Sequence, residues 1–224
     1  MKTVGIIIAM GKEYCSLEKL LEKPLKTENV VGITISTHRL KNKTAVIARC
    51  GIGEIYAATA ATILTVNYKV DELLNYGFVG ALSDKYKIFD ILAVGDVVHY
   101  DMDLTAFGNP PGQYADKKEI YWRADNALTS ALIKNKFPVE RIASADKFVR
   151  SIETKLNIAK IFCAEICDME SAGIAVVANK ANVPFASIKL IVDGVTGDCY
   201  SEFEENAKKG AECLAKIIYE YLSE

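Results

Sequence analysis

Continuous apolar runs, each the length of one strand, constrain the fold of this chain more than any other feature. The runs are apolar at consecutive positions rather than at alternate ones, which indicates strands that are covered on both faces of a sheet. Val, Ile and Leu dominate them. Seven such strands are predicted: Thr3–Ala9, Val30–Thr37, Thr44–Arg49, Glu72–Tyr76, Asp96–Tyr100, Arg141–Ala145 and Phe185–Val192.

Helix-length segments with apolar residues at i, i+3 and i+4 lie between or after these strands. The clearest are Ile55–Asn67, Met169–Lys180 and Glu204–Tyr221. Strands that alternate with helices predict an α/β layer architecture with a largely parallel sheet. No repeat or Pro/Gly/Ser-rich linker divides the chain, so we expect a single domain over residues 1–224. The longest irregular stretch, Thr105–Asp116, is expected to be a surface loop that can carry function.

The charge and cysteine content of the chain exclude several classes of protein. The formal net charge is −2 and there is no basic run, so nucleic acid is not an expected partner. The longest strongly apolar stretch, Val4–Met10, is too short to span a bilayer and no cleavable signal follows it, so we expect a cytoplasmic protein that does not bind membranes. His38 and His99 are far apart and lack ligand-spaced neighbours, so neither a metal nor another cofactor is expected. Reduced and mostly buried thiols are expected at Cys15, Cys50, Cys163, Cys167, Cys199 and Cys213.

Acidic residues follow three of the predicted strands or open the helices after them. Ligands of α/β sheets bind beyond the carboxyl ends of the strands, so these acids are the first candidates for a site. Glu13 lies in "AMGKEY", in the opening turn of a helix after the first strand. Asp168, Met169 and Glu170 open the Ala-rich helix in "CDMESAG", and Asp193 ends the late strand in "KLIVDG".

Each of these acids also has a structural interpretation. Glu13 and Glu170 can stabilise helix starts through the macrodipole, and Asp168 can be an N-cap. Asp193 can be a cap or turn residue, but a carboxylate that emerges from a buried strand needs a cap, a cation or a ligand. No nucleophile elbow is present, and "RCGIGE" lacks both the third glycine of a dinucleotide fingerprint and a Walker lysine.

The segment "NYGFVGAL", residues 75–82, is expected to be a glycine loop beyond the strand Glu72–Tyr76. A Gly-x-x-Gly turn after a strand is a common place for a bound phosphate or sugar. Here the residues between Gly77 and Gly80 are Phe78 and Val79, which offer no side-chain donor. The segment therefore raises the question of whether an anion can bind there at all.

Taken in order along the chain, several segments resemble the nucleoside phosphorylase/nucleosidase family, and within it the 5′-methylthioadenosine/S-adenosylhomocysteine nucleosidases. The resemblance runs from Lys2 to the final helix. It implies a single three-layer α/β/α domain whose central mixed sheet curls towards a barrel. It also implies a homodimer with a shared active site and cleavage of the N-glycosidic bond of a purine nucleoside. The segments that carry it are "GIIIAMGKE", "CGIGEIYAATAAT", "NYGFVGAL", "VGDVV", "HYDMDLTAFG", "ADKFV", "DMESAGIA" and "NVPFASIKLIVD".

The resemblance implies catalytic roles for the acids. Asp193 matches the general acid that protonates purine N7, and Glu13 matches the acid that orients or deprotonates the attacking water. Glu170 matches the residue that accepts hydrogen bonds from the ribose 2′- and 3′-hydroxyls. Asp168 and Met169 belong to the same sugar-binding motif, in which Met169 packs against the sugar face.

The resemblance also assigns residues to the purine and to the 5′ group. Phe148 and the backbone of Val149 match positions that stack on and hydrogen-bond the purine, and Phe203 would cover its other face. Leu104 and Phe107 match residues lent across the dimer interface to the 5′ substituent. Gly77 is expected to let the backbone approach the ribose.

Water is favoured over phosphate as the nucleophile. Phosphorylases of this fold place an Arg just before the Gly-x-x-Gly and a Ser or Thr inside it; here these positions hold Asn75 and Phe78. Glu13 would repel a phosphate dianion, and Lys12 at the helix start is expected to point elsewhere. A phosphate-dependent purine nucleoside phosphorylase and a non-catalytic nucleoside-binding protein remain alternatives.

Three residues depart from the nucleosidase pattern. Phe78 and Val192 replace serines, the second of them just before Asp193, and Asn109 replaces an aromatic residue. They leave open the preferred 5′ substituent and the choice between adenine and a 6-oxopurine.

Overall fold

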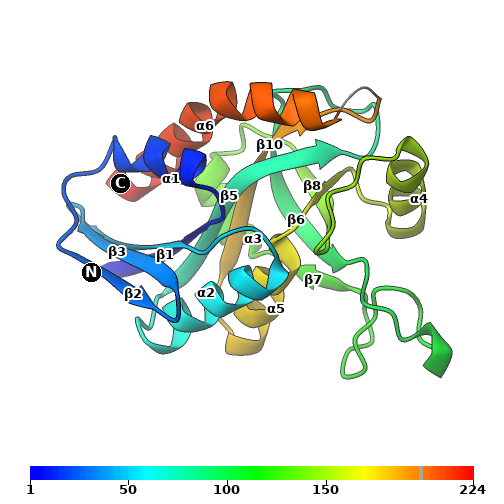
Figure 1. Ribbon diagram of the computed structural model, residues 1–224. Helices are drawn as coiled ribbons and strands as arrows, with labels where there is room; N and C mark the ends of the chain where they lie inside the picture. Colours follow the sequence, from blue (N-terminus) through cyan, green and yellow to red (C-terminus); the bar gives the residue numbers. More distant parts are fainter. Residues whose placement is uncertain (197–198) are drawn as a thin grey trace.

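The computed structural model describes residues 1–196 and 199–224, in which one sheet lies between two layers of helices (Figure 1). The strands are β1 (Lys2–Ile8), β2 (Lys26–Val30), β3 (Ile33–Arg39), β4 (Lys43–Arg49), β5 (Glu72–Ala81), β6 (Ile91–His99), β7 (Tyr121–Arg123), β8 (Val139–Ser144), β9 (Ile166–Asp168) and β10 (Phe185–Asp193). The helices are α1 (Gly11–Glu18), α2 (Glu54–Val66), α3 (Asn126–Ile133), α4 (Ile152–Phe162), α5 (Ser171–Ala181) and α6 (Cys199–Ser223), with a short 3₁₀ helix, η1 (Thr105–Phe107).

The sheet closes on itself at one end. Its strand order is β10-β6-β8-β9-β5-β1-β4-β3-β2, and β10 pairs with β5 as well as with β6. Strands β5, β10, β6, β8 and β9 therefore form a ring, while β1, β4, β3 and β2 extend it as an open sheet. Parallel pairs such as β1–β5 and β5–β10 coexist with antiparallel pairs such as β6–β10 and β5–β9. The mixed, partly barrel-like sheet is confirmed, and the largely parallel sheet expected from the alternation of elements alone is wrong.

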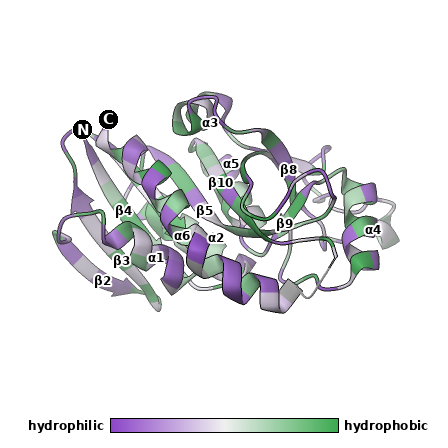
Figure 2. Ribbon diagram, turned by 90° about the horizontal axis from the view of Figure 1, so that it is seen from above, coloured by the Kyte–Doolittle hydropathy of each residue, from purple (hydrophilic) through white to green (hydrophobic). Residues whose placement is uncertain are grey.

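The helices cover both faces of the sheet, as continuous apolar strands require. Helices α2 and α5 lie together on one face and α1 and α6 on the other (Figure 1). Each pair of helices packs with one of two separate groups of buried apolar side chains. Along α6 the hydrophilic and hydrophobic residues alternate with the helical period (Figure 2), and Ala207, Ala211, Leu214 and Ile218 are buried.

Several predicted elements differ from the structure. The expected strand Val30–Thr37 is a hairpin of β2 and β3, because Val31 and Gly32 both have positive φ, at 51° and 81°. The short strands β7 and β9 and the helices α3 and α4 were not predicted. The segment 77–81 was expected to be a loop but belongs to β5, in which all ten residues are buried. The difference arises because Gly77 and Gly80 indicate the end of a strand when the sequence is considered alone.

The cysteines also differ from the expectation. Cys15, Cys163 and Cys213 are exposed, while Cys50 and Cys167 are buried. The prediction of mostly buried thiols is therefore wrong for these five; the side chain of Cys199 lies outside the described part of the structure.

Among the described residues, no helix combines the length and the apolar composition that crossing a membrane requires.

Candidate active site

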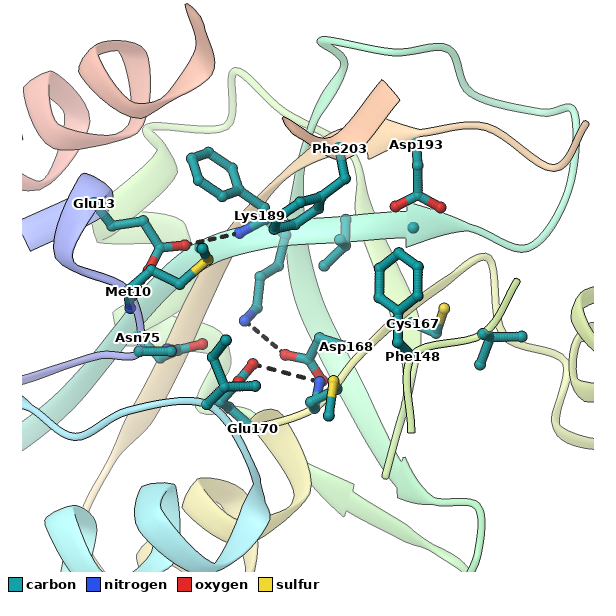
Figure 3. A pocket seen from close by; sticks show the side chains of 18 of the residues that line it. Met10, Glu13, Asn75, Phe148, Cys167, Asp168, Glu170, Lys189, Asp193 and Phe203 are labelled. Atoms are coloured by element: carbon teal, nitrogen blue, oxygen red, sulfur yellow. Dashed lines mark hydrogen bonds and ion pairs between the residues drawn. The ribbon is translucent and has the colours of Figure 1, made fainter. Parts of the chain in front are cut away.

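One pocket, with about 660 Å³ of space including its open mouth, collects most of the residues predicted from the sequence (Figure 3). It lies at the carboxyl ends of β1, β5, β9 and β10, where α/β folds place their ligands. The predicted residues that line it are Glu13, Gly77, Phe78, Phe148, Val149, Asp168, Met169, Glu170, Asp193 and Phe203.

Leu104 and Phe107 are the two predicted residues that do not line this pocket. They lie in and beside η1, on a segment that extends away from the body of the fold (Figure 1). The Phe107 side chain is 82% exposed. Within one chain, neither residue is placed to touch a ligand in the pocket.

The register between β5 and β10 determines how the pocket is built. Lys189 lies opposite Gly77, and after an irregularity in the ladder Asp193 lies opposite Gly80. A Cβ atom added at Gly80 would be 2.8 Å from Asp193 Oδ2, and one at Gly77 would be 2.8 Å from Glu13 Oε1. The two glycines of "NYGFVGAL" thus leave room for two carboxylates to lie directly on the strand.

Glu13 fits both of its sequence interpretations. It is the third residue of α1, and its Oε2 accepts a hydrogen bond from the Met10 backbone N–H at 2.9 Å, as in a capping box. Its Oε1 accepts from the Phe78 N–H at 3.2 Å, which holds the carboxyl group in the pocket. Burial raises the pKa of Glu13 to about 7, although these hydrogen bonds oppose the shift. A buried acid with a pKa near neutrality is suited to proton transfer.

Lys189 is a buried cation in the pocket that the sequence reasoning missed. Its Nζ donates to Asp168 Oδ2 at 2.7 Å, and its side chain points into the group of acids (Figure 3). Burial opposes the charged form of Lys189, but the charges of Asp168 and Glu170 raise its pKa above the ordinary value. The sequence does contain an indication of this cation: a lysine inside the apolar run "FASIKLIVD" is expected to be buried and to need a buried acidic partner.

Asp168 and Glu170 lie on either side of the turn from β9 into α5 and differ in protonation. Burial opposes the charged form of Asp168, but Lys189 and hydrogen bonds from two serines bring its pKa below the ordinary value. Burial and the charge of Asp168 raise the pKa of Glu170 to about 8. Glu170 Oε1 accepts from the Gly53 N–H at 3.1 Å. Asp168 accepts from the Ser171 hydroxyl and N–H, so it is bonded to the helix start as the N-cap interpretation expected, although the N-cap residue is Glu170.

Glu54 is an acid next to Asp168 that the sequence did not reveal. The Ser144 Oγ is 2.5 Å from both Glu54 Oε1 and Asp168 Oδ1. One hydroxyl has one hydrogen to donate, so one of the two carboxyl groups must carry a proton. Burial and the charge of Asp168 raise the pKa of Glu54 to about 8, which assigns that proton to Glu54. Its other oxygen accepts from the Gly173 N–H.

Asp193 ends β10 and is 3% exposed. Its Oδ2 accepts a hydrogen bond from Lys155 Nζ at 2.6 Å, within an ion pair that the sequence did not reveal. The preceding Val192, where the family pattern has a serine, is fully buried and offers no side-chain donor to the acid. The carboxylate thus has the cation that its position at the end of a buried strand requires.

Three phenylalanines form the apolar wall of the pocket. The Phe203 ring meets Phe78 and Phe148 edge to face, with centroids 6.2 and 6.0 Å apart. Phe148 is 40% exposed, while Phe78 is buried beside Glu13. Such a wall can hold a flat aromatic ligand between its rings.

Comparisons with known proteins agree with this geometry. The family model of the phosphorylase superfamily matches residues 3–223. The chain is 31% identical to a 5′-methylthioadenosine/S-adenosylhomocysteine nucleosidase of Shewanella sediminis and 30% identical to one of Staphylococcus aureus, with 99% of each chain covered. A mutant of the Helicobacter pylori nucleosidase with 5′-methylthioadenosine in the active site superposes with a TM-score of 0.93 at 26% identity, covering 99% of this chain and 98% of that one. Futalosine hydrolase of H. pylori has the same score and identity, with 98% and 97% covered.

We expect Gly80→Ala to impair the site without unfolding the protein. The added methyl group would be 2.8 Å from Asp193 Oδ2 and 3.1 Å from Oδ1, so the carboxyl group must move. A displacement of about 1 Å at a reacting group can reduce kcat about 10²-fold. Gly11→Ala is the matched control, because nothing lies within 4 Å of its added Cβ. Steady-state kinetics and thermal melting of both variants would test this, and an unimpaired Gly80→Ala enzyme would contradict it.

We expect Glu54→Gln to reduce the loss of stability at high pH. Glu54 has a pKa of about 8 in the folded protein and 4.5 as its ordinary value, so its contribution to stability is complete below about pH 4.5 and is lost as the pH rises to about 8. Glutamine retains a donor for Ser144 and cannot ionise. Between pH 5 and pH 9, the free energy of unfolding of the variant should therefore rise relative to that of the wild type, on the order of a few kcal/mol.

Denaturant unfolding across this pH range measures the effect, with Glu153→Gln as an exposed control. Parallel pH profiles of wild type and Glu54→Gln would show that Glu54 is already ionised in the native state.

Proposed function

The chain belongs to the phosphorylase superfamily, and from this premise we propose that it hydrolyses the N-glycosidic bond of adenine nucleosides. The substrates are of the 5′-methylthioadenosine and S-adenosylhomocysteine type, and the products are adenine and the ribose derivative. The observation that carries the proposal is the arrangement of the two carboxyl groups: Glu13 lies on Gly77 and Asp193 lies on Gly80. These glycines are three positions apart, which corresponds to roughly 10 Å along β5. A nucleoside fits between a carboxyl group at each end.

The two carboxyl groups support different steps. Asp193 protonates N7 as the C1′–N9 bond breaks, because the leaving purine anion is unstable without a proton. Glu13, with a pKa of about 7, takes a proton from the water that attacks C1′. Glu170 lines the same pocket and accepts hydrogen bonds from the ribose hydroxyls, which favours its ionised form once a ligand is bound. The acids also stabilise the positive charge that develops on the sugar.

The aromatic wall supports binding of the base. Phe148 and Phe203 line the same end of the pocket as Asp193, so a purine held by these rings has its N7 edge towards the acid. Phe78 fills the other end, beside Glu13. The purine therefore belongs near the pocket mouth and the ribose deeper, over β5.

Charge in the ribose end supports water as the nucleophile. Lys189 is a cation there, but Asp168 neutralises it at 2.7 Å, and Glu13 and Glu170 surround it. Lys12 is directed towards Glu204 on α6 at 3.3 Å, away from the pocket as expected. The Phe78 N–H already donates to Glu13. A phosphate dianion placed beside Lys189 would meet these acidic groups; Lys147, the other lysine that lines the pocket, lies next to Phe148 in the chain.

The segment around η1 supports a homodimer. Phe107 is 82% exposed and Leu104 is partly exposed, on a segment that projects from the fold. Apolar side chains placed in this way are costly to leave in water. We propose that they reach the 5′ end of the partner's pocket, as the family resemblance implies.

The assay that tests the function is release of free base from a nucleoside panel, with and without phosphate. We expect adenine from 5′-methylthioadenosine in phosphate-free buffer, at a rate that added phosphate leaves unchanged. Asp193→Asn should lower kcat about 10²–10⁴-fold while ligand binding is largely kept, because one general acid contributes that much. The panel also includes S-adenosylhomocysteine, futalosine and inosine. These nucleosides differ in the 5′ group or in the base, so the preference for each part can be measured separately.

Two results would replace the proposal. Strict dependence on phosphate would identify a phosphorylase. Binding of adenosine analogues without turnover, equal in wild type and Asp193→Asn, would identify a nucleoside-binding protein.

The dimer proposal predicts a substrate-dependent effect of Phe107→Ala. KM for 5′-methylthioadenosine should rise about tenfold, whereas KM for a nucleoside with a bare 5′-hydroxyl should change little. Leu25→Ala, at a residue that is 67% exposed, is the control. Light scattering gives the mass in solution; a monomeric, fully active wild type would exclude the shared site.

A further inference from the structure

Lys155 is a buried lysine that connects two sides of the pocket. It lies in the first turns of α4 and has no exposed surface, whereas Lys160 on the same helix is exposed. Its Nζ is 2.6 Å from Asp193 Oδ2 and 2.6 Å from the Gly194 carbonyl oxygen. The ammonium group therefore contacts both the side chain of the proposed general acid and the backbone that follows it.

Stability alone does not explain a lysine at this position. Moving an ammonium group and a carboxylate out of water costs several kcal/mol per ion, and apolar residues of similar volume often stabilise such positions equally well. The other side chains of α4 that are buried, Ile158 and Phe162, are apolar. A charged residue on the same buried face of the helix points to a requirement of the site.

The contacts restrict Asp193 from two directions. The backbone of β5 lies beneath the carboxyl group at Gly80, close enough that a Cβ there would be 2.8 Å from Oδ2. Lys155 holds the same oxygen from the side of α4. The carboxyl group thus has a fixed orientation relative to the strand, while the residue still lines the pocket.

The same lysine links the acid to the part of the pocket that binds the base. Helix α4 follows directly after the segment that contains Phe148 and Val149, both of which line the pocket. By bonding to Asp193 and Gly194, Lys155 ties this segment to the end of β10. One side chain thus connects the acid to the segment that carries Phe148 and Val149.

We propose that Lys155 is the positioning residue of the leaving-group acid, an inference that rests on the proposed function. The free site holds Asp193 as a carboxylate beside the Lys155 ammonium, so the carboxyl group first takes up a proton from solvent. As the C1′–N9 bond breaks, its electron pair passes to the purine and Asp193 gives this proton to N7. Neutral adenine leaves, and Asp193 becomes a carboxylate beside the Lys155 ammonium, which stabilises the new charge and keeps its own protons. The water proton goes to Glu13, and exchange with solvent restores both acids.

The inference separates leaving groups that need a proton from those that do not. For 5′-methylthioadenosine, Lys155→Met should lower kcat about 10²-fold with a smaller change in KM, the size of effect expected when general-acid catalysis is impaired. A 4-nitrophenyl 5-methylthioriboside releases a stable anion, so its turnover should stay within about threefold of wild type. Lys155→Arg should recover part of the lost activity, and Lys160→Met should behave as wild type.

A double variant tests whether Lys155 acts through Asp193. In the Asp193→Asn background, Lys155→Met should have no further effect on methylthioadenosine turnover, because the proton donor is already absent. This variant also removes the buried carboxylate that Lys155 contacts, so it remains informative if Lys155→Met alone does not fold.

Three results would overturn the inference: wild-type turnover of methylthioadenosine by Lys155→Met, equal losses on both substrates, or a further loss in the Asp193→Asn background. If the proposed function itself is wrong, the wild-type protein will release no adenine in phosphate-free buffer. This result is different from the three above, so the two kinds of failure can be told apart.

Discussion

The pairing of β10 with β5 is the interaction on which the rest of the structure depends. It closes the ring of strands and sets the register that brings Lys189 to Gly77 and Asp193 to Gly80. Because glycines occupy those two positions of β5, carboxyl groups can lie on the strand where any other residue would place a side chain. A shift of β10 by one residue in this pairing would turn Lys189 and Asp193 to the opposite face and away from the pocket.

The acids in so small a volume remain stable because they differ in protonation and in partners. Asp168 is charged and paired with Lys189, and Asp193 is paired with Lys155. Burial raises the pKa values of Glu54 and Glu170 to about 8, so both carry protons near neutrality when no ligand is bound. Glu13, with a pKa of about 7, is divided between the neutral and the ionised form and can still take a proton from water. The site thus holds charge next to the sugar and the base while it limits the cost of burying five acids.

For the segment "NYGFVGAL", the sequence predicts the chemistry of the side chains but not the secondary structure. Its lack of side-chain donors was visible, and so was its contrast with a phosphate-binding loop. The sequence did not show that these residues continue a strand, because glycine is ordinarily a sign that a strand ends. Lys155 and Lys189 were missed for a related reason: each pairs with an acid far away in sequence, and only the assembled sheet and α4 bring them together.

The sequence alone determined the α/β class, the family resemblance and ten residues of the pocket, because apolar periodicity and local motifs are properties of consecutive residues. The structure decided the closure of the sheet, the partners of each acid and the position of Leu104 and Phe107 outside the chain's own pocket. These features depend on long-range register and on burial. Whether a carboxyl group is charged or neutral follows from which cation and how little water the fold places beside it.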